Sequence, residues 1–532
     1  MSTWPIVMGL IKRSYSQLWT VSLRMIESIV LQSRALQNRA LKNSALKNKG
    51  FRNSALKTPW EMPAIRFARF VKRFVKRFVK RFVGRDTLDR YTSGLRWHLD
   101  FPDAQRPPWL LPGGWVVQGW VVLPEALAEW VGKAEIIARW SKTFELCHPL
   151  SVRRPDVIEA LFGTADESHP QVQCGFRFTV PHRLEQFSLF LRLGDMQFPL
   201  SQVDIPSDVH LDDALPPSLK VLEGKQGWLF LDNDTNGSVD QYRGRLRLTE
   251  GGVEQWQQYF QAVEQLADSA EAAHAVLVAP SKESVMGPSY HPFTEGSNGP
   301  IQQLMALPEA HSIVYPQALL TQLGDEAFIR TDSHWSQQGA MVAAKALATA
   351  LDLDPNAVNA LFAEDEYVQR TIVGDLGNKF TPERHCNIEV LRSFSYMKCR
   401  YYDNGLPNFG RLSVLVNDQA LMPSVCLLFG SSSSYSMLNY LCRLFQQVVF
   451  VHSAGSLDPE LVKAVNPAYL VMQTNARFMV QVPEVDQSLL KLIDEKRARL
   501  SEDEWASVAK RKISVARDDA LIHKLNLTPW LV

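Results

Sequence analysis

Between Pro217 and Val482, short apolar runs alternate with longer stretches of helical periodicity, and this alternation restricts the possible folds more than any other feature of the chain. The apolar runs are typical of strands that are buried on both faces: AHAVLVAP, HSIVYP, SVCLLFG, QVVFVH and YLVMQT. The stretches between them, such as VEQWQQYFQAVEQLADSAEA and GAMVAAKALATALD, are typical of helices. Repeated βα units predict an open, mostly parallel sheet with helices on both faces, in which reactive groups collect at the carboxyl ends of the strands.

A different pattern fills the segment from Pro112 to Pro206, where Gly and Pro separate short strand-like runs such as GGWVVQGWVVLP and QFSLFLRLGDMQFPL. This pattern predicts a small antiparallel β-sandwich over residues 105–210. The segment resembles the accessory β-sandwich modules that are attached to bacterial glycan-modifying enzymes. Its tryptophans are candidates for stacking on sugars, although in a small sandwich such residues more often belong to the core: Trp115, Trp120 and Trp140.

The length of 532 residues predicts two or three domains, because one hydrophobic core seldom supports so long a chain. We expect the α/β domain to cover residues 217–485. Residues 486–532 are expected to form a helical tail, in which the charged segment LLKLIDEKRARLSEDEWASVAKRK predicts a solvated helix.

The first 95 residues form a basic, low-complexity arm. Residues 1–90 contain 20 Lys and Arg against 4 Asp and Glu, whereas residues 91–532 contain 37 against 52, so the two parts carry net charges of +16 and −15. FVKR repeats every four residues within 66–85, which predicts a basic amphipathic helix able to lie on a membrane surface or to bind a polyanion. An arm that folds back onto the acidic body, or an expanded tail without a role, fits equally well. We expect no nucleic acid partner.

Two features of the sequence bear on the compartment. The six cysteines show no CxxC spacing and several lie in apolar runs, which favours buried free thiols in a reducing compartment. The chain has no run of 18 or more apolar residues, and its first apolar stretch precedes the Lys-Arg pair, the reverse of the order in a secretory signal. These observations favour the cytoplasm.

The segment SVCLLFGSSSSYSMLNYL, Ser424 to Leu441, has the form of a strand, a tight turn and a helix. A serine directly after the glycine would be presented at a helix N-terminus, where free N–H groups can stabilise an oxyanion. The same serines could instead serve only as a helix cap, which is a common arrangement.

A serine needs a base, and TDSHWSQQGA supplies a histidine with a carboxylate two residues before it. We expect a helix from Trp335 to Asp352, with His334 at its start, where the helix dipole would keep the imidazole neutral. Ser336 could equally act as an N-cap. Asp332 and His334 could also bind a metal ion with His385 or Cys386, but no metal-binding spacing supports this, so we expect neither a metal nor a cofactor.

Several motifs occur in the order found in the SGNH-hydrolase-like proteins of the alginate O-acetyltransferase (AlgJ/AlgX) group: GKQGWLFL, VAPSKESV, TDSHWSQQGA, GDLGNKF, LLFGSSSSYS and TNARF. Residues 217–482 resemble this family. The resemblance implies a catalytic triad in which Asp-x-His precedes the serine, and it assigns these roles to Asp332, His334 and Ser432. The turn here has four consecutive serines where the family usually has Gly-Asp-Ser or Gly-Thr-Ser, so Ser433 and Ser434 remain alternative nucleophiles.

The resemblance implies a polysaccharide O-acetyltransferase that works through an acyl-serine and receives its acetyl group from a membrane-bound O-acyltransferase. It also implies a periplasmic or membrane-associated protein. The same residues would serve a carbohydrate esterase with water as acceptor, and the altered turn leaves open a glycan-binding scaffold without activity. Candidates for oxyanion or substrate contacts stand near predicted strand ends or loops: Asn378, Lys282 and Arg477.

Overall fold

The structure is a computed structural model that describes residues 94–102, 110–111, 114–163, 166–181, 184–205 and 221–531. The basic arm and the amphipathic helix expected within 66–85 lie outside these residues. Their membrane contact therefore stays a prediction.

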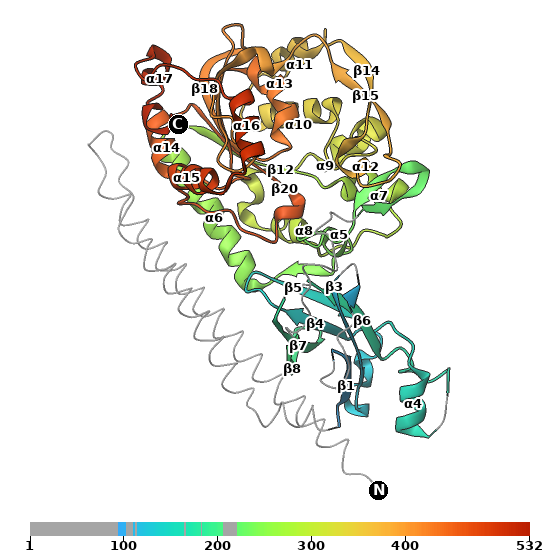
Figure 1. The fold of residues 1–532 in the computed structure, drawn as a ribbon. Helices are drawn as coiled ribbons and strands as arrows, with labels where there is room; N and C mark the ends of the chain where they lie inside the picture. Colours follow the sequence, from blue (N-terminus) through green and yellow to red (C-terminus); the bar gives the residue numbers. More distant parts are fainter. Residues whose placement is uncertain are drawn as a thin grey trace, which may run out of the picture. The chain divides into compact units, whose positions relative to one another are not determined.

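A seven-stranded sheet forms the centre of the α/β region, in the order β13-β12-β20-β18-β19-β17-β16 (Figure 1). The strands from β13 to β19 are parallel, and β17 and β16 continue the sheet as antiparallel strands. All five predicted apolar runs form strands of this sheet, so the expected mixed α/β fold is confirmed. The strands have the following bounds: β12 (Ala273–Ala279), β13 (Ile313–Val314), β16 (Arg400–Asp403), β17 (Leu412–Val416), β18 (Met422–Gly430), β19 (Phe445–His452) and β20 (Tyr469–Asn475).

Alternate residues of the central strands belong to two separate hydrophobic clusters, one on each face of the sheet. In β18, Cys426 and Leu428 belong to one cluster, and Leu427 and Phe429 to the other. The first cluster is covered by α7 (Lys282–Tyr290), α9 (Gln317–Leu323), α10 (Gln337–Ala350), α11 (Pro355–Phe362) and α13 (Ser434–Leu444). The second is covered by α6 (Glu250–Ser269), α8 (Pro300–Met305), α14 (Pro459–Val465) and the C-terminal helices. Burial on both faces explains why these strands are continuously apolar.

Two antiparallel sheets precede the α/β region. One joins β1 (Arg96–Phe101), β2 (Leu110–Leu111), β3 (Gly114–Val122) and β6 (Gly175–Val180). The other has the order β11-β5-β4-β7-β8 and includes β4 (Glu135–Arg139), β5 (Phe144–Pro149), β7 (Gln186–Leu193), β8 (Met196–Asp204) and β11 (Leu246–Leu248). Because β11 follows the 217 boundary in the chain and pairs with β5, the second sheet draws its edge strand from the α/β region.

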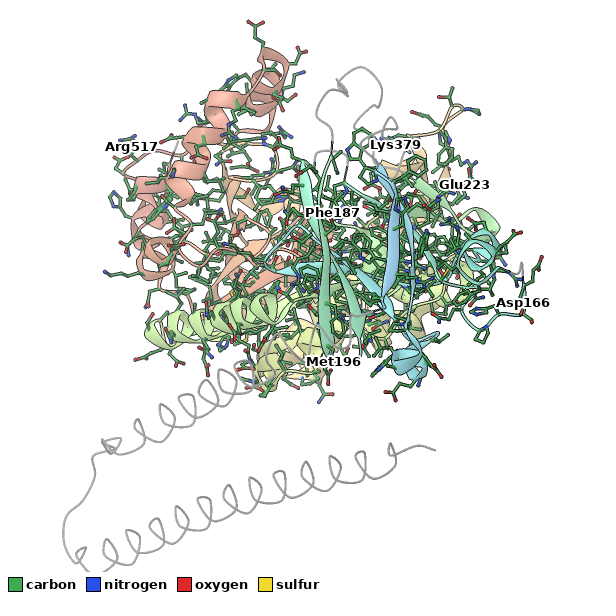
Figure 2. All side chains as sticks on the ribbon, turned by 90° about the horizontal axis from the view of Figure 1, so that it is seen from below. Asp166, Phe187, Met196, Glu223, Lys379 and Arg517 are labelled. Atoms are coloured by element: carbon green, nitrogen blue, oxygen red, sulfur yellow. The ribbon has the colours of Figure 1, made fainter. Side chains whose placement is uncertain are left out.

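Side chains of the antiparallel sheets follow the alternation that the sequence shows. Figure 2 labels Phe187 of β7 and Met196, the first residue of β8. The side chain of Phe187 is 1% exposed, whereas that of Met196 is 41% exposed. Trp115 is buried and belongs to the core, so its side chain is not available for stacking on a sugar. Trp120 and Trp140 are half-buried.

The C-terminal segment corrects the expectation of a solvated helix. It forms α15 (Leu489–Arg499), α16 (Glu502–Arg511) and α17 (Ala520–Lys524), and each helix buries apolar side chains against the sheet. Leu489, Ile493 and Val508 are at most 4% exposed. The charged residues dominate the composition, but the few apolar residues recur on one side and form a buried stripe.

The remaining elements border the site or the antiparallel sheets. They are α4 (Pro155–Phe162), β9 (Val221–Glu223), β10 (Leu229–Leu231), α5 (Ser238–Tyr242), the hairpin β14 (Tyr367–Ile372) and β15 (Cys386–Leu391), and the short α12 (Gly374–Gly377). All six cysteines are free thiols, and Cys426 and Cys442 are buried as expected. Within the described ranges, no helix has the length and apolar character needed to cross a membrane.

Candidate active site

Three neighbouring parallel strands bring their carboxyl ends to one pocket. β12 leads into Ser281 and Lys282, β18 into the serine turn, and β20 into Asn475 and Arg477. The order β12-β20-β18 makes these strands adjacent in the sheet. His334 and Ser433 also line the pocket. The pocket therefore lies at the edge of the sheet where the sequence predicts reactive groups.

The serine turn, Gly430 to Ser434, has four hydroxyl groups, and three of them are bound by side chains of β20. Oγ of Ser431 and Oγ of Ser434 donate to Oε1 of Gln473, at 2.8 and 2.7 Å, and Oγ of Ser433 donates to Oδ1 of Asn475 at 2.9 Å. These three serines are buried, whereas Ser432 is half-buried. A side chain at Gly430 would overlap the hydroxyl of Ser434, so the tight turn requires glycine.

Asp332, His334 and Ser432 form a continuous row of hydrogen bonds. Nδ1 of His334 lies 2.7 Å from Oδ1 of Asp332, and Nε2 of His334 lies 2.9 Å from Oγ of Ser432. The tautomer that fits donates its Nδ1 proton to the carboxylate and accepts the serine proton at Nε2. Of the four serines in the turn, Ser432 is the one whose hydroxyl contacts this histidine. The contacts of Ser433 and Ser434 are with other groups, as described above.

The carboxylate of Asp332 is fixed by backbone groups from two segments. Oδ1 also accepts from the N–H of His334 at 2.9 Å, and Oδ2 accepts from the N–H of Asp375, in α12, at 2.9 Å. Asp375 in turn accepts from the N–H and the hydroxyl of Ser333. Gly374, with a φ of 78°, lets α12 approach this loop, because a Cβ there would overlap the carbonyl of Thr331.

The position of His334 differs from the expectation. α10 begins at Gln337, with Ser336 as its N-cap, and His334 lies two residues before that cap. The predicted capping role of Ser336 is confirmed, since its hydroxyl accepts from the N–H of Gly339 at 2.9 Å. The helix does not keep the imidazole neutral by a lowered pKa. Burial alone would lower the pKa of His334, but the hydrogen bond and charge of Asp332 and the charge of Asp375 outweigh burial and raise it.

The same contacts act on the carboxylate in the opposite direction. Burial favours the protonated acid, but the hydrogen bonds from His334 and the N–H of Asp375 hold the pKa of Asp332 at about 2. Asp332 is therefore ionised at neutral pH. An ionised carboxylate fixes the imidazole orientation and stabilises the imidazolium that forms when the histidine accepts a proton.

Lys282 is buried beneath the loop that carries Asp332 and His334. Its Nζ donates to four backbone carbonyl oxygens at 2.7 to 2.9 Å: those of Leu229, Ile329, Arg330 and Asp332. The side chain is 3% exposed. Burial lowers the pKa of Lys282 to about 7, and the charges of Glu283 and Asp332 oppose this shift. The four carbonyl oxygens that accept from Nζ also favour the ammonium form. The ammonium group already donates to backbone carbonyl oxygens. Lys282 therefore holds the loop in position, whereas its place in the sequence suggests a contact with the substrate.

The other two candidate contacts have different surroundings. Arg477 lines the pocket beside His334, and its guanidinium group lies 3.8 Å from the carboxylate of Asp234. Asn378 is exposed, one residue after α12, and does not line the pocket. Of these two predicted contacts, the structure brings only Arg477 to the serine and histidine.

Asn475 is a pocket residue that the sequence reasoning did not identify. Its Oδ1 accepts hydrogen bonds from the hydroxyls of Ser433 and Ser431, which orients the amide. Within the described part of the chain, neither its Nδ2 nor the backbone N–H of Ser432 donates to a protein acceptor. The N–H of Ser432 belongs to the nucleophile candidate itself, and Asn475 contacts the serines on either side of it, so both donors are candidates for an oxyanion site. The signal was the position of Asn475 directly after an apolar run, in the motif TNARF.

A metal ion at Asp332, His334 and Asp375 would have to compete with the hydrogen bonds that these side chains already make. Ligand atoms of Asp332, His334 and Asp375 lie within 4.8 Å of one another. Both carboxylates already accept N–H or O–H donors, which a cation would repel. The third ligands suggested by the sequence are engaged elsewhere: His385 lies 3.2 Å from the carbonyl oxygen of Glu383, and the Sγ of Cys386 accepts from the Thr331 hydroxyl at 3.1 Å.

A comparison with protein families agrees with the resemblance. Residues 221–454 match the family described as ALGX, SGNH hydrolase-like domain, acetyltransferase AlgX, which confirms the family resemblance for this part of the chain. A comparison with curated proteins found no match.

Similar solved structures include the O-acetyltransferase domain of Pseudomonas putida AlgJ, with 18% identity, a TM-score of 0.33, and coverage of 52% of this chain and 99% of that one. Pseudomonas aeruginosa AlgX shows 15% identity and a TM-score of 0.34, covering 52% of this chain and 66% of that one. Bacillus cereus PatB1 with a sulfonyl adduct shows 11% identity and a TM-score of 0.35, covering 51% of this chain and 99% of that one.

Proposed function

We propose that this protein is a polysaccharide O-acetyltransferase that uses Ser432 as nucleophile, His334 as base and Asp332 as the group that orients the base. The observation that carries the proposal is the row of two hydrogen bonds, 2.7 and 2.9 Å long, that joins these side chains inside the region matching the acetyltransferase family. Nucleophile, base and orienting acid at these distances are what acyl transfer through a covalent ester requires.

The first half-reaction transfers the acetyl group to the enzyme. Oγ of Ser432 attacks the acetyl carbonyl of the donor while Nε2 of His334 accepts its proton. The N–H of Ser432 and Nδ2 of Asn475 stabilise the negative oxygen of the tetrahedral intermediate. The intermediate collapses as the donor oxygen leaves with the proton held by His334, and acetyl-Ser432 remains.

The second half-reaction repeats these steps with a sugar hydroxyl. His334 accepts the hydroxyl proton, the sugar oxygen attacks the acetyl carbonyl, and Ser432 leaves with a proton from His334. The product is an O-acetylated glycan. Water in place of the sugar would make the same residues an esterase, so the acceptor decides between the two activities.

The proposal also covers the accessory domain, the source of the acetyl group and the location of the protein. The two antiparallel sheets would form a β-sandwich module that accompanies the catalytic region. The acetyl donor would be delivered by a membrane-bound O-acyltransferase, and the basic arm could bring the enzyme to that membrane. A periplasmic or membrane-associated location would suit such a partner.

The experiment compares the parent protein with Ser432→Ala and, as matched control, Ser433→Ala. Each is incubated with a chromogenic acetyl ester, with and without an oligosaccharide acceptor, and the sugar product is examined by mass spectrometry. We expect acetylated sugar from the parent and none from Ser432→Ala, with partial activity in Ser433→Ala. Ester hydrolysis without sugar acetylation would identify an esterase. Equal acetyl transfer by Ser432→Ala and the parent would refute the mechanism, and the absence of activity in both proteins would favour a scaffold.

A further inference from the structure

Two cysteines, Cys399 and Cys442, contact one another outside the catalytic pocket, and the proposed chemistry makes no use of them. Cys399 is the last residue of the 3₁₀ helix η6 (Tyr396–Cys399), which leads directly into β16, the last strand of the seven-stranded sheet. Cys442 lies in α13, the helix that follows the serine turn (Figure 1). Neither residue lines the catalytic pocket. Their chemistry is therefore separate from the acyl transfer proposed above.

The segment that contains η6 packs along one side of α13. The N–H of Tyr396 donates to Oδ1 of Asn439 at 2.9 Å. The guanidinium of Arg443 lies over the ring of Phe394, 5.2 Å from its centroid. Asn439 and Arg443 are four residues apart in the helix and Cys442 is three residues after Asn439, so all three lie on the side of α13 that faces this segment. The packing holds the end of η6 against Cys442.

A hydrogen bond joins the thiols of Cys399 and Cys442 and acts on them in opposite directions. It lowers the pKa of Cys399 to about 7, and it raises the pKa of Cys442, which burial raises further. At neutral pH a large share of Cys399 is therefore thiolate, the form that attacks a disulfide. Cys399 is half-buried and accessible to a small oxidant, whereas Cys442 is 1% exposed. Cys399 is therefore the thiol that an oxidant meets first.

The other four cysteines have different surroundings. Burial raises the pKa of Cys147 and Cys174 to about 11, and it raises the pKa of Cys426, in the central strand β18, even further. Cys386 is half-buried, and its Sγ accepts from a threonine hydroxyl at 3.1 Å. A low thiol pKa, partial exposure and contact with a second thiol occur together at Cys399.

We propose that Cys399 and Cys442 form a stabilising disulfide when a disulfide oxidant such as glutathione disulfide is present. The thiolate of Cys399 attacks one sulfur of glutathione disulfide and releases one glutathione. The thiol of Cys442 then loses its proton, and its sulfur attacks that of Cys399 and releases the second glutathione. Two thiols become one disulfide, and their two electrons and two protons end on the two glutathione molecules.

The disulfide would join the start of β16 to α13, two places roughly 40 residues apart in sequence. Closing a loop of this length restricts the unfolded chain, so the oxidised protein should be more stable than the reduced one. Because disulfides persist in oxidising compartments, the pair would be closed in the periplasm and open in the cytoplasm. The contact between the two thiols carries this inference, which does not depend on the proposed acyl transfer.

The purified full chain is reduced, freed of reductant and incubated with glutathione disulfide, and free thiols are blocked before digestion and mass spectrometry. We expect two peptides cross-linked through Cys399 and Cys442. The oxidised protein should melt about 2–5 °C above the reduced protein. Cys399→Ser should show neither the cross-link nor the difference in melting temperature. Cys386→Ala is the matched control, since it removes a half-buried thiol elsewhere, and it should show both.

Four results would overturn the proposal: no oxidation of Cys399, a glutathione adduct that Cys442 does not displace, a cross-link to Cys426 instead, or equal melting temperatures of the oxidised and reduced parent. If Cys399→Ser fails to fold, the reduced parent still decides. Iodoacetamide at pH 7 should label Cys399 at least about 10-fold faster than Cys147, Cys174 or Cys426. Labelling of Cys399 at the same rate as these three would also overturn the proposal.

Discussion

The serine turn and the Asp-His loop are each organised around one buried polar side chain, but these two side chains are of opposite kinds. Gln473, in β20, is neutral, and its Oε1 accepts hydrogen bonds from Ser431 and Ser434. Lys282, just after β12, is a cation whose Nζ donates to four carbonyl oxygens. Both strands are neighbours in the sheet, since Leu277 of β12 is in register with Gln473.

The serine turn and the Asp-His loop differ in how far the neighbouring residues in sequence determine their backbone conformation. The turn consists of consecutive residues between a strand and a helix, so its backbone would be close to its final form without Gln473. The loop has no regular structure, and it is held by a side chain about 50 residues away in sequence. We therefore expect the loop to depend on its anchor more strongly than the turn depends on Gln473.

The largest expected effect on activity is that of Asp332→Asn, which changes the carboxylate of the Asp-His loop but keeps the contact between the loop and Lys282. Asp332→Asn removes the acid that orients His334, but the contact of Lys282 with residue 332 is through the backbone carbonyl. We expect kcat/KM for acetyl ester cleavage to fall about 10⁴-fold, and the free energy of unfolding to fall by less than about 2 kcal/mol. Ester kinetics and urea unfolding measure the two quantities.

Asp354→Asn is the matched control for Asp332→Asn. Asp354 is an exposed N-cap of α11, and asparagine caps helices as well as aspartate does. This variant should keep both activity and stability. A loss of less than tenfold in Asp332→Asn would mean that Asp332 does not orient the base.

Lys282→Met tests the anchor itself. Four buried carbonyl groups lose their donor, so we expect a loss of roughly 3–5 kcal/mol in the free energy of unfolding and a fall of about 10³-fold in kcat/KM. The low-field proton resonance of the His334 to Asp332 hydrogen bond should disappear. Lys463→Met, which removes an exposed lysine in α14, should change none of these. Retention of the resonance and of activity would show that the loop does not need its cation.

Gln473→Leu makes the corresponding change beneath the serine turn. The N–H and hydroxyl of Ser431 and the hydroxyl of Ser434 lose an acceptor, which should cost about 2–3 kcal/mol of stability and about 10²-fold in kcat/KM. Because the loop is untouched, the low-field resonance of His334 should persist. If Gln473→Leu lowered stability and kcat/KM more than Lys282→Met does, the serine turn would depend on Gln473 more strongly than the loop depends on Lys282.

The same contrast explains what could be predicted from the sequence. The five apolar strands, the serine turn and Ser336 as a helix cap depend on local patterns, and the structure has them where the patterns indicate. The carbonyl contacts of Lys282 could not be predicted, because they join segments that come together only through the fold. For the same reason the sequence did not show that the N–H of Asp375 donates to Asp332, or that Asn475 accepts hydrogen bonds from Ser431 and Ser433.

The structure differs from the sequence-based predictions in two further places, the C-terminal helices and the start of α10. The C-terminal helices are rich in charge, and this concealed the apolar side chains that pack against the sheet. The expected helix at Trp335 begins two residues later, at Gln337, because Ser336 caps it. This shift places His334 in the loop, where carboxylates and not the helix dipole determine its pKa.

The smallest expected effect concerns Asp375, which accepts hydrogen bonds from Ser333 of the loop but takes no part in the proposed proton transfers. Its carboxylate lies 3.7 Å from Nδ1 of His334 and helps to raise the pKa of that histidine. Since the base must be neutral, activity should fall as the pH drops through this raised pKa. Asp375→Asn removes one of the charges that favour imidazolium, so the acid limb should move to lower pH, with less than a tenfold change at neutral pH. A profile of kcat/KM against pH measures this shift, and Asp354→Asn should leave the limb in place. An acid limb that stays fixed or moves upward in Asp375→Asn would mean that Asp332 alone sets the protonation of His334.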